Sequence, residues 1–222
     1  MLNDEQKKAV EYNKGPLLIV AGAGTGKTTV IVEKIKYLLK QKLTKPEEIL
    51  ALTFTEKAAF EMEERVDKEI PYGYFQMWIS TFHAFADQVL KEQATHIGIT
   101  PGFRLMTEAE TIIFLRKNLF LFNLNYFRPL GNPNKFLNAL LDHFSRLRDE
   151  DITPDQYLKW VEKQNDSDET KKYMELANAY KTYQALKVKE GLFDFSDLIY
   201  YLLKLFRERK NILEDYQKKF KY

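Results

Sequence analysis

Residues 16–28 read PLLIVAGAGTGKT, an apolar run that leads into a glycine-rich loop and then a Lys-Thr pair. The run predicts a buried strand at residues 16–21, and periodic apolar residues predict a helix over residues 27–40. Small residues between them let successive backbone N–H groups turn inward, where the helix N-terminus adds partial positive charge. The segment therefore predicts a site for the phosphates of a nucleoside triphosphate.

The Lys-Thr pair has the sharpest predicted roles. Lys27 would place its ammonium between the β- and γ-phosphates, and the Thr28 hydroxyl would complete the shell of a Mg²⁺ ion carried by the nucleotide. These two are the candidate catalytic residues, and Thr28 is also the candidate metal ligand. Ala21 stands where G-x-x-x-x-G-K-[ST] has its first glycine, a minor departure at a strand end. The candidate nucleotide-binding residues of this segment are Ala21, Gly22, Ala23, Gly24, Thr25, Gly26, Lys27, Thr28 and Thr29.

Composition excludes several other classes of protein. In 222 residues, 45% are hydrophobic, and 34 Lys and Arg face 32 Asp and Glu, so any nucleic-acid surface would be a local patch. The absence of cysteine excludes disulfides, thiolate metal sites and cysteine nucleophiles. No run approaches the roughly 18 apolar residues of a membrane span, and the start is no signal peptide. We expect a cytoplasmic protein with no membrane partner.

Strand and helix patterns alternate over the first hundred residues. Strands are predicted at residues 49–54 and 77–80 and a helix at residues 56–67, which favours an α/β fold with a parallel sheet flanked by helices. From a capping-box signature at residues 107–110 the pattern is helical to about residue 190, and Gly191 ends it. Two more helices are predicted at residues 197–209 and 211–219.

The helical part carries no sharp catalytic signal. Its aromatic residues between Phe114 and Phe144 alternate with leucine at helical spacing and are predicted to be core. Asp194 and Asp197 are expected to cap a helix rather than to bind a metal. The basic residues there are mixed with acids, so a solvated face explains them as well as a DNA surface does: Arg146, Arg148, Lys171 and Lys172.

Five blocks in the same order closely resemble the amino-terminal half of UvrD/Rep/PcrA-type DNA helicases. They are LNDEQ (2–6), the loop AGAGTGKT (21–28), TFTEKAAFEM (53–62), STFHAF (80–85) and FDFSDL (193–198). The resemblance is strong over residues 1–90 and 190–222 and only architectural between them. It implies a P-loop RecA-like parallel sheet flanked by helices, with an all-helical inserted subdomain. The implied divisions are residues 1–100 for the first RecA-like, ATP-binding domain, 101–190 for the insert and 191–222 for the return to that domain.

The resemblance also assigns ligand contacts. Gln6 would read the adenine edge and select ATP, because an amide offers a donor and an acceptor side by side. Family members commonly carry arginine where this chain has Thr29, so one nucleotide contact is in doubt. ATP and Mg²⁺ are therefore the implied cofactors.

The third and fourth blocks look like the family's contacts with single-stranded DNA. Thr55 and its helix N-terminus would hold a backbone phosphate, Lys57 would add charge, and Phe54 would stack on a base or else pack in the core. Thr81 and His83 would form the second contact, although a lone histidine is otherwise an ordinary hydrogen-bonded residue. The family usually has asparagine where this chain has Glu56, which disfavours a phosphate there.

The catalytic set of an ATPase is incomplete in this sequence. We find no apolar strand ending in Asp-Glu and no arginine finger, both of which hydrolysis needs. We therefore expect the ATP- and single-stranded-DNA-binding amino-terminal portion of a 3′–5′ DNA helicase, an ATP-dependent enzyme only when full length. Its partner would be the rest of the helicase, with the second RecA-like domain. Two alternatives remain, an AddA/RecB-type helicase–nuclease and a stand-alone, non-hydrolysing P-loop binding module.

Overall fold

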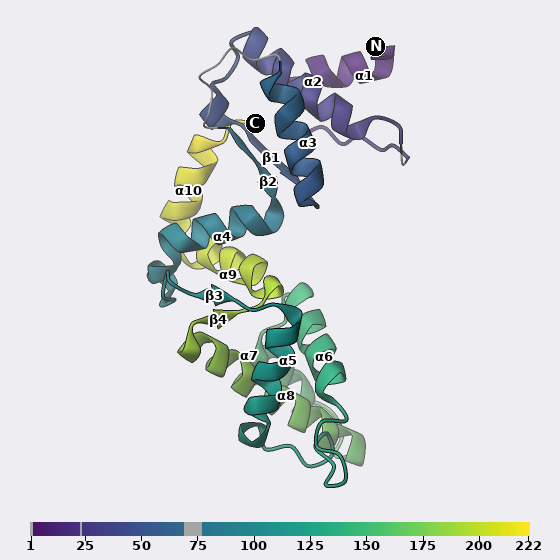
Figure 1. The fold of residues 1–222 in the computed structure, drawn as a ribbon, viewed down its shortest axis with the longest axis vertical. Coiled ribbons are helices and arrows are strands. Elements are labelled where there is room, and N and C mark those ends of the chain that lie inside the picture. The colour runs from purple at the N-terminus through teal and green to yellow at the C-terminus, as the bar shows by residue number, and fades with distance from the viewer. Residues whose placement is uncertain (1, 23, 69–76) are drawn as a thin grey trace. The chain divides into compact units, whose positions relative to one another are not determined.

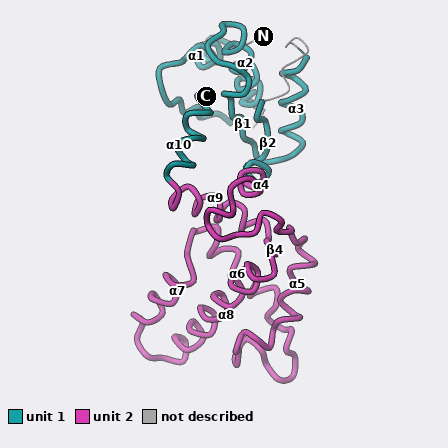
Figure 2. Tube along the Cα trace, turned by 90° about the vertical axis from the view of Figure 1, so that its left-hand side faces the viewer, with its two compact units in different colours: residues 1–85, 210–222 teal, residues 86–209 magenta. Residues whose placement is uncertain are grey.

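The computed structural model describes residues 2–22, 24–68 and 77–222. The chain divides into two compact units, shown in Figure 2: unit 1 is residues 1–85 with 210–222, and unit 2 is residues 86–209. Helices dominate both, and each unit holds a short parallel sheet, which confirms the predicted α/β class in its broad form. Within the described ranges, no helix combines the length and the apolar character that crossing a membrane requires.

The sheet of unit 1 is built from two parallel strands, β1 (Leu50–Thr53) and β2 (Trp78–Thr81), with Thr53 opposite Thr81. Both strands confirm the predictions at residues 49–54 and 77–80. Helices α2 (Lys27–Lys40) and α3 (Glu56–Asp67) begin and end where the sequence predicts, because apolar side chains recur at three- and four-residue spacing. Their apolar faces meet the sheet in one core, which contains Val32, Ile35, Ile49, Ala51, Met62 and Val66.

The strand predicted at residues 16–21 is wrong, because the structure assigns no strand there. Leu18 is 85% exposed and Val20 is 89% exposed. An apolar run becomes a strand only when neighbouring strands pair its backbone groups. In the described part of the chain, β1 pairs with β2 on one side, and the Leu50 N–H donates to the carbonyl of Tyr222 on the other.

The amino- and carboxy-terminal helices of unit 1 frame this sheet (Figure 1). Helix α1 (Asp4–Glu11) contacts α2, and the 3₁₀ turn η1 (Pro46–Glu48) precedes β1. Helix α10 (Lys210–Lys219) brings the end of the chain to β1, where the N–H groups of Lys221 and Tyr222 donate to the Glu48 carbonyl. Phe220 also packs on Trp78, with ring centroids 5.4 Å apart. Helix α4 (Phe82–Gln93) follows β2.

Unit 2 is a helical body, as the pattern after residue 106 predicts, and it also holds one small parallel sheet that was not predicted. The Thr107–Glu110 capping box forms at the start of α5, and Gly191 ends α8 with φ of +63°, a left-handed backbone that suits glycine. Its elements are η2 (Ala94–Ile97), β3 (Arg104–Leu105), α5 (Glu108–Lys117), η3 (Leu119–Phe122), α6 (Leu137–Asp149), α7 (Pro154–Val161), α8 (Asp168–Glu190), β4 (Leu192–Phe193) and α9 (Phe195–Glu208).

The aromatic residues of unit 2 divide between its core and its surface. Phe114, Phe122 and Phe144 are buried in the core, as predicted. The prediction is wrong for Phe120 and Tyr126, which are 76% and 49% exposed. Both lie in or after η3, where helical spacing no longer decides which side chains face inward.

Candidate functional site

The glycine-rich loop of unit 1 adopts a backbone that needs its glycines. Gly24 has φ of +75° and Gly26 has φ of +86°, a left-handed region that other residues enter at a cost. Gly26 is also the N-cap of α2, and among the described residues no side chain caps that helix. The first turn of α2 contains no acid. Its backbone N–H groups therefore keep their capacity to bind an anion.

The Lys27 side chain is held against the backbone of the loop. Lys27 Nζ donates to the carbonyls of Ala21 at 3.1 Å and Gly22 at 2.5 Å, so the ammonium folds back over the loop. The Thr25 hydroxyl donates to the Gly22 carbonyl at 2.8 Å, which closes the turn. Thr28 is half-buried and Thr29 is exposed, whereas Ala23 lies outside the described residues.

Gln6 joins helix α1 to the glycine-rich loop. Its Oε1 accepts from the backbone N–H of Asn3 at 2.9 Å, and its Nε2 donates to the Thr25 carbonyl at 3.2 Å. A Cβ at Gly26 would lie 3.2 Å from Gln6 Nε2, so the amide and the loop are closely fitted. Both groups that were predicted to read adenine are thus bound within the chain, and the adenine role stays a prediction.

The residues predicted to contact DNA follow the carboxyl ends of two neighbouring strands. Because Thr53 pairs with Thr81, β1 and β2 end at the same edge of their sheet. Thr55 caps α3 by accepting from the Ala58 N–H at 3.1 Å. The Thr81 hydroxyl donates to Glu56 Oε1 at 2.9 Å, so the end of β2 and the start of α3 are joined by a hydrogen bond.

This edge combines a buried threonine with exposed aromatic rings. Thr81 is 4% exposed, and its hydroxyl also accepts from the Ala84 N–H at 3.1 Å, so its interactions are made inside unit 1. Phe54 is 88% exposed, so core packing does not explain it. Its ring lies 5.5 Å from that of Phe82, which is 41% exposed. Phe82 was not among the residues predicted to contact DNA, although it stands between Thr81 and His83.

Comparison with known proteins identifies the chain's family. The model of the family described as UvrD/REP helicase N-terminal domain matches residues 2–222. The chain belongs to this family. It is 36% identical over 222 residues to the ATP-dependent DNA helicase PcrA of Bacillus subtilis, and 37% identical over 223 residues to PcrA of Staphylococcus aureus strain Mu50. Each match covers all of this chain and 28% of the relative, so the chain spans about 28% of the length of these relatives.

In this chain of the UvrD/REP helicase family, unit 2 holds a second polar centre, which we call the buried charge cluster: Arg148, Lys187, Asp194 and Asp197. Lys187 Nζ lies 2.5 Å from Asp194 Oδ2 and 2.6 Å from Asp197 Oδ2, while Arg148 Nε lies 3.3 Å from Asp197 Oδ1. The Asp197 side chain is fully buried, and those of Lys187 and Arg148 are 1% and 2% exposed. The solvated face expected for Arg148 is therefore wrong.

The buried charge cluster fixes the start of α9. Asp194 is its N-cap and forms a capping box with Asp197, which confirms the expected capping role. Asp194 Oδ2 also accepts from the Tyr183 hydroxyl at 3.1 Å. Burial by itself would raise the pKa of Asp194, but the charge and hydrogen bond of Lys187 outweigh it and lower that pKa to about 2.

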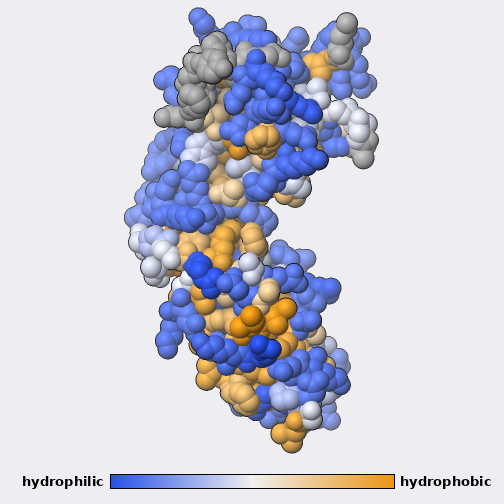
Figure 3. All heavy atoms as spheres, viewed as in Figure 1, coloured by the Kyte–Doolittle hydropathy of each residue, from blue (hydrophilic) through white to orange (hydrophobic). Residues whose placement is uncertain are grey.

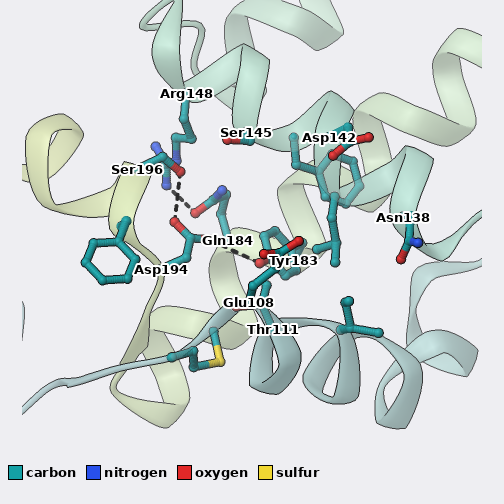
Figure 4. Close-up of a pocket in the computed structure, with 15 residues that line it drawn as sticks. Glu108, Thr111, Asn138, Asp142, Ser145, Arg148, Tyr183, Gln184, Asp194 and Ser196 are labelled. Atoms are coloured by element: carbon teal, nitrogen blue, oxygen red, sulfur yellow. Dashed lines mark hydrogen bonds between the residues drawn. The ribbon is translucent and has the colours of Figure 1, made fainter.

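A cavity of about 290 Å³ lies beside the buried charge cluster (Figure 4). Arg148, Gln184 and Asp194 line it, and Arg148 Nη2 donates to Gln184 Oε1. The Arg148 guanidinium also lies 3.6 Å from the ring centroid of Tyr200. Every charge of the cluster already has a partner of opposite sign, so we regard the cluster as structural.

Proposed function

We propose that this chain is the ATP- and single-stranded-DNA-binding amino-terminal portion of a 3′–5′ DNA helicase. The observation that carries the proposal is the glycine-rich loop, with two left-handed glycines, an inward lysine and an uncapped helix N-terminus directly after it. This combination suits a polyphosphate, because each feature offers positive charge or N–H donors to the same place. Membership in the UvrD/REP helicase family and the similarity to PcrA, an ATP-dependent DNA helicase, favour ATP.

The residues of the loop fit a nucleotide with its Mg²⁺. Lys27 would exchange the carbonyls of Ala21 and Gly22 for phosphate oxygens, since a phosphate is the stronger acceptor for an ammonium. The half-buried Thr28, in the first turn of α2, would hold Mg²⁺, which supplies charge neutralisation on the phosphates. The loop would keep its backbone, because the left-handed glycines already give it that form.

Single-stranded DNA would lie along the edge where β1 and β2 end. The α3 N-terminus capped by Thr55 offers N–H groups to a phosphate, Lys57 and His83 are exposed there, and Phe54 offers a ring face. Thr81 would act by holding the Glu56 carboxylate rather than by touching DNA, because its hydroxyl is buried and bonded to that group. Few cations are present, so we expect weak binding that falls with salt.

The remaining assignments belong to the same proposal. Residues 1–100 and 191–222 would form the RecA-like ATP-binding domain, and residues 101–190 would be the inserted helical subdomain. DNA unwinding and the second RecA-like domain are properties that we propose for the full-length protein. Asp194 directly follows strand β4, but it is bound to Lys187, so we do not expect it to polarise water.

ATP binding is tested by thermal denaturation with and without millimolar ATP and Mg²⁺. A ligand at a hundred times its Kd stabilises the folded state by about 2.7 kcal/mol, so the wild-type Tm should rise. Lys27→Ala should remove most of that rise, whereas Lys40→Ala, at the other end of α2, should keep it. Phosphate release should stay at background. ATP hydrolysis at rates typical of helicases would contradict the proposal that this chain binds ATP without hydrolysing it.

DNA binding is tested by fluorescence anisotropy with a labelled oligothymidylate. Phe54→Ala should weaken binding about tenfold, since stacking on one base contributes roughly 1–3 kcal/mol. Phe60→Ala is the matched control, because Phe60 is also exposed, at 65%, but lies along α3 rather than at the strand ends. Equal binding of blunt duplex and single strand at matched salt would refute this part of the proposal.

A further inference from the structure

One surface of unit 2 alternates aromatic rings with cations. Arg128 lies 4.9 Å from the ring centroid of Phe120, Lys172 lies 4.2 Å from that of Tyr126, and Lys135 lies 5.1 Å from that of Phe136. The distances run from the guanidinium carbon of Arg128 and the Nζ atoms of the lysines. We call this surface the aromatic belt and define it by Phe120, Tyr126, Arg128, Lys135, Phe136 and Lys172.

The aromatic belt has two parts. In the first, the Tyr126 and Phe136 rings are stacked at 24°, with centroids 5.9 Å apart. Phe127 packs against both, since its ring is 5.0 Å from that of Tyr126 and 5.5 Å from that of Phe136. Arg128, the next residue in the chain, forms the second part with Phe120. Together the two parts hold three rings and three cations.

The rings of the aromatic belt are accessible. Phe120 is 76% exposed although Arg128 lies over its ring, and Tyr126 is 49% exposed. Leu130, on the loop between them and α6, is fully exposed. Figure 3 shows orange, hydrophobic residues among blue ones at the lower end of unit 2. Exposed rings of this size usually mark a contact surface rather than a core.

The cations of the aromatic belt carry uncompensated charge. Among the residues that the structure describes, no carboxylate forms an ion pair with Arg128, Lys135 or Lys172. The nearby carboxylate of Glu175 accepts from the backbone N–H groups of Asn125 and Tyr126. The belt therefore attracts an anionic partner, and its rings favour one with flat faces.

We infer that the aromatic belt binds single-stranded nucleic acid, with Arg128, Lys135 and Lys172 on backbone phosphates and the Phe120 and Tyr126 rings against bases. A single strand supplies both phosphates and free base faces, whereas in a duplex the bases are already stacked on one another. An acidic peptide supplies carboxylates but no matching flat faces. The inference rests on the proposed function, and it adds to unit 2 a contact surface beyond the strand ends of unit 1.

The test uses the whole 222-residue chain and a fluorescein-labelled oligothymidylate of about 20 nucleotides. The double variant Arg128→Glu with Lys172→Glu is compared with Lys189→Glu with Lys204→Glu, which makes the same change in net charge outside the belt. We expect the belt variant to bind about tenfold more weakly than the control. We also expect the slope of log affinity against log salt to fall by about 1.4, since each phosphate contact on a single strand contributes about 0.7.

Two further measurements keep the result independent of folding. Arg128→Gln with Lys172→Gln should weaken binding in the same direction without introducing acids, and its melting curve should match the wild type. A strand that contains 5-iodouracil should, on irradiation, form an adduct on a peptide that includes Phe120 or Tyr126, because iodouracil couples preferentially to aromatic side chains it stacks on.

The outcomes separate this inference from the proposed function. If the wild-type chain binds no single strand even at low salt, DNA binding by this chain is refuted altogether. If it binds but the belt and control variants have equal affinity and slope, only the aromatic belt is refuted. A labelled duplex that competes as well as the single strand, or adducts confined to unit 1, would equally overturn the belt as a single-strand surface.

Discussion

Lys187 provides the most demanding test of how unit 2 is held together. Lys187→Met keeps the length of the side chain but removes the ammonium that contacts Asp194 at 2.5 Å and Asp197 at 2.6 Å. Removing one partner of a buried ion pair usually costs about 3–5 kcal/mol, because a charge is left buried without compensation. Arg148 still contacts Asp197, and the Asp194 side chain is 20% exposed, so we expect the lower end, about 3 kcal/mol.

The same helix supplies a matched control. Lys181→Met removes an ammonium 3.1 Å from Asp155, but those side chains are 58% and 74% exposed, so we expect a loss below about 1 kcal/mol. Urea unfolding is followed by tryptophan fluorescence in a Trp78→Phe background, because Trp160 then reports on unit 2 alone. A loss for Lys187→Met no larger than that for Lys181→Met would refute the reasoning. Recovery of stability on adding Asp194→Asn would support it, since that change removes the carboxylate whose only cationic partner among the described residues was Lys187, and asparagine can still cap α9.

Two other predictions concern pH and the glycine-rich loop. The pKa of Asp194 falls from about 3.9 in the unfolded chain to about 2 in the folded one. Its contribution to stability, about 2.5 kcal/mol, is therefore complete above pH 5 and is lost as the pH falls towards 2. The stability difference between wild type and Asp194→Asn, measured by urea unfolding, should therefore shrink over that range, and a constant difference would contradict it. Gly26→Ala should reduce the ATP-induced rise in Tm, because Gly26 has φ of +86° and an added Cβ would lie 3.2 Å from Gln6 Nε2. Gly22→Ala should have a smaller effect, because its Cβ would meet only Thr25 Cγ2, at an ordinary contact distance of 3.7 Å. An equal effect of the two substitutions would show that ATP binding does not depend on the left-handed backbone at Gly26.

Local signals in the sequence predicted the local structure well. Helices α2 and α3 follow from apolar spacing, and Thr55 marks the start of α3 by capping it. The capping boxes of Thr107 and Asp194 form as their residue types predict. That the Thr53 and Thr81 ends lie together also follows from the sequence, because both blocks come directly after strands.

Features that depend on distant partners could not be predicted in the same way. The run at residues 16–21 is as apolar as a buried strand, but its sequence does not say which strands pair with it. The buried charge cluster joins Arg148 of α6 to Lys187 of α8 and Asp197 of α9, and no spacing along the chain links them. Phe120 has the composition of a core residue and is exposed, because η3 breaks the helical period.

Unit 1 is assembled from two separate pieces of chain, and this has a consequence for the order of events during synthesis. Glu48 is bound to Lys221 across 173 positions, so the contacts that η1 and β1 make with residues 221–222 form only after that segment has been synthesised. Within unit 2, however, Arg209 Nε donates to the His96 carbonyl at 2.7 Å across 113 positions. If unit 2 folds first, its 113 positions no longer count towards the flexible loop between Glu48 and Lys221, which shortens from 173 to about 60 residues. The entropic cost of closing that loop then falls by about 0.9 kcal/mol. Folding of unit 2 would then bring residues 210–222, which are synthesised late, back towards strands that were synthesised much earlier.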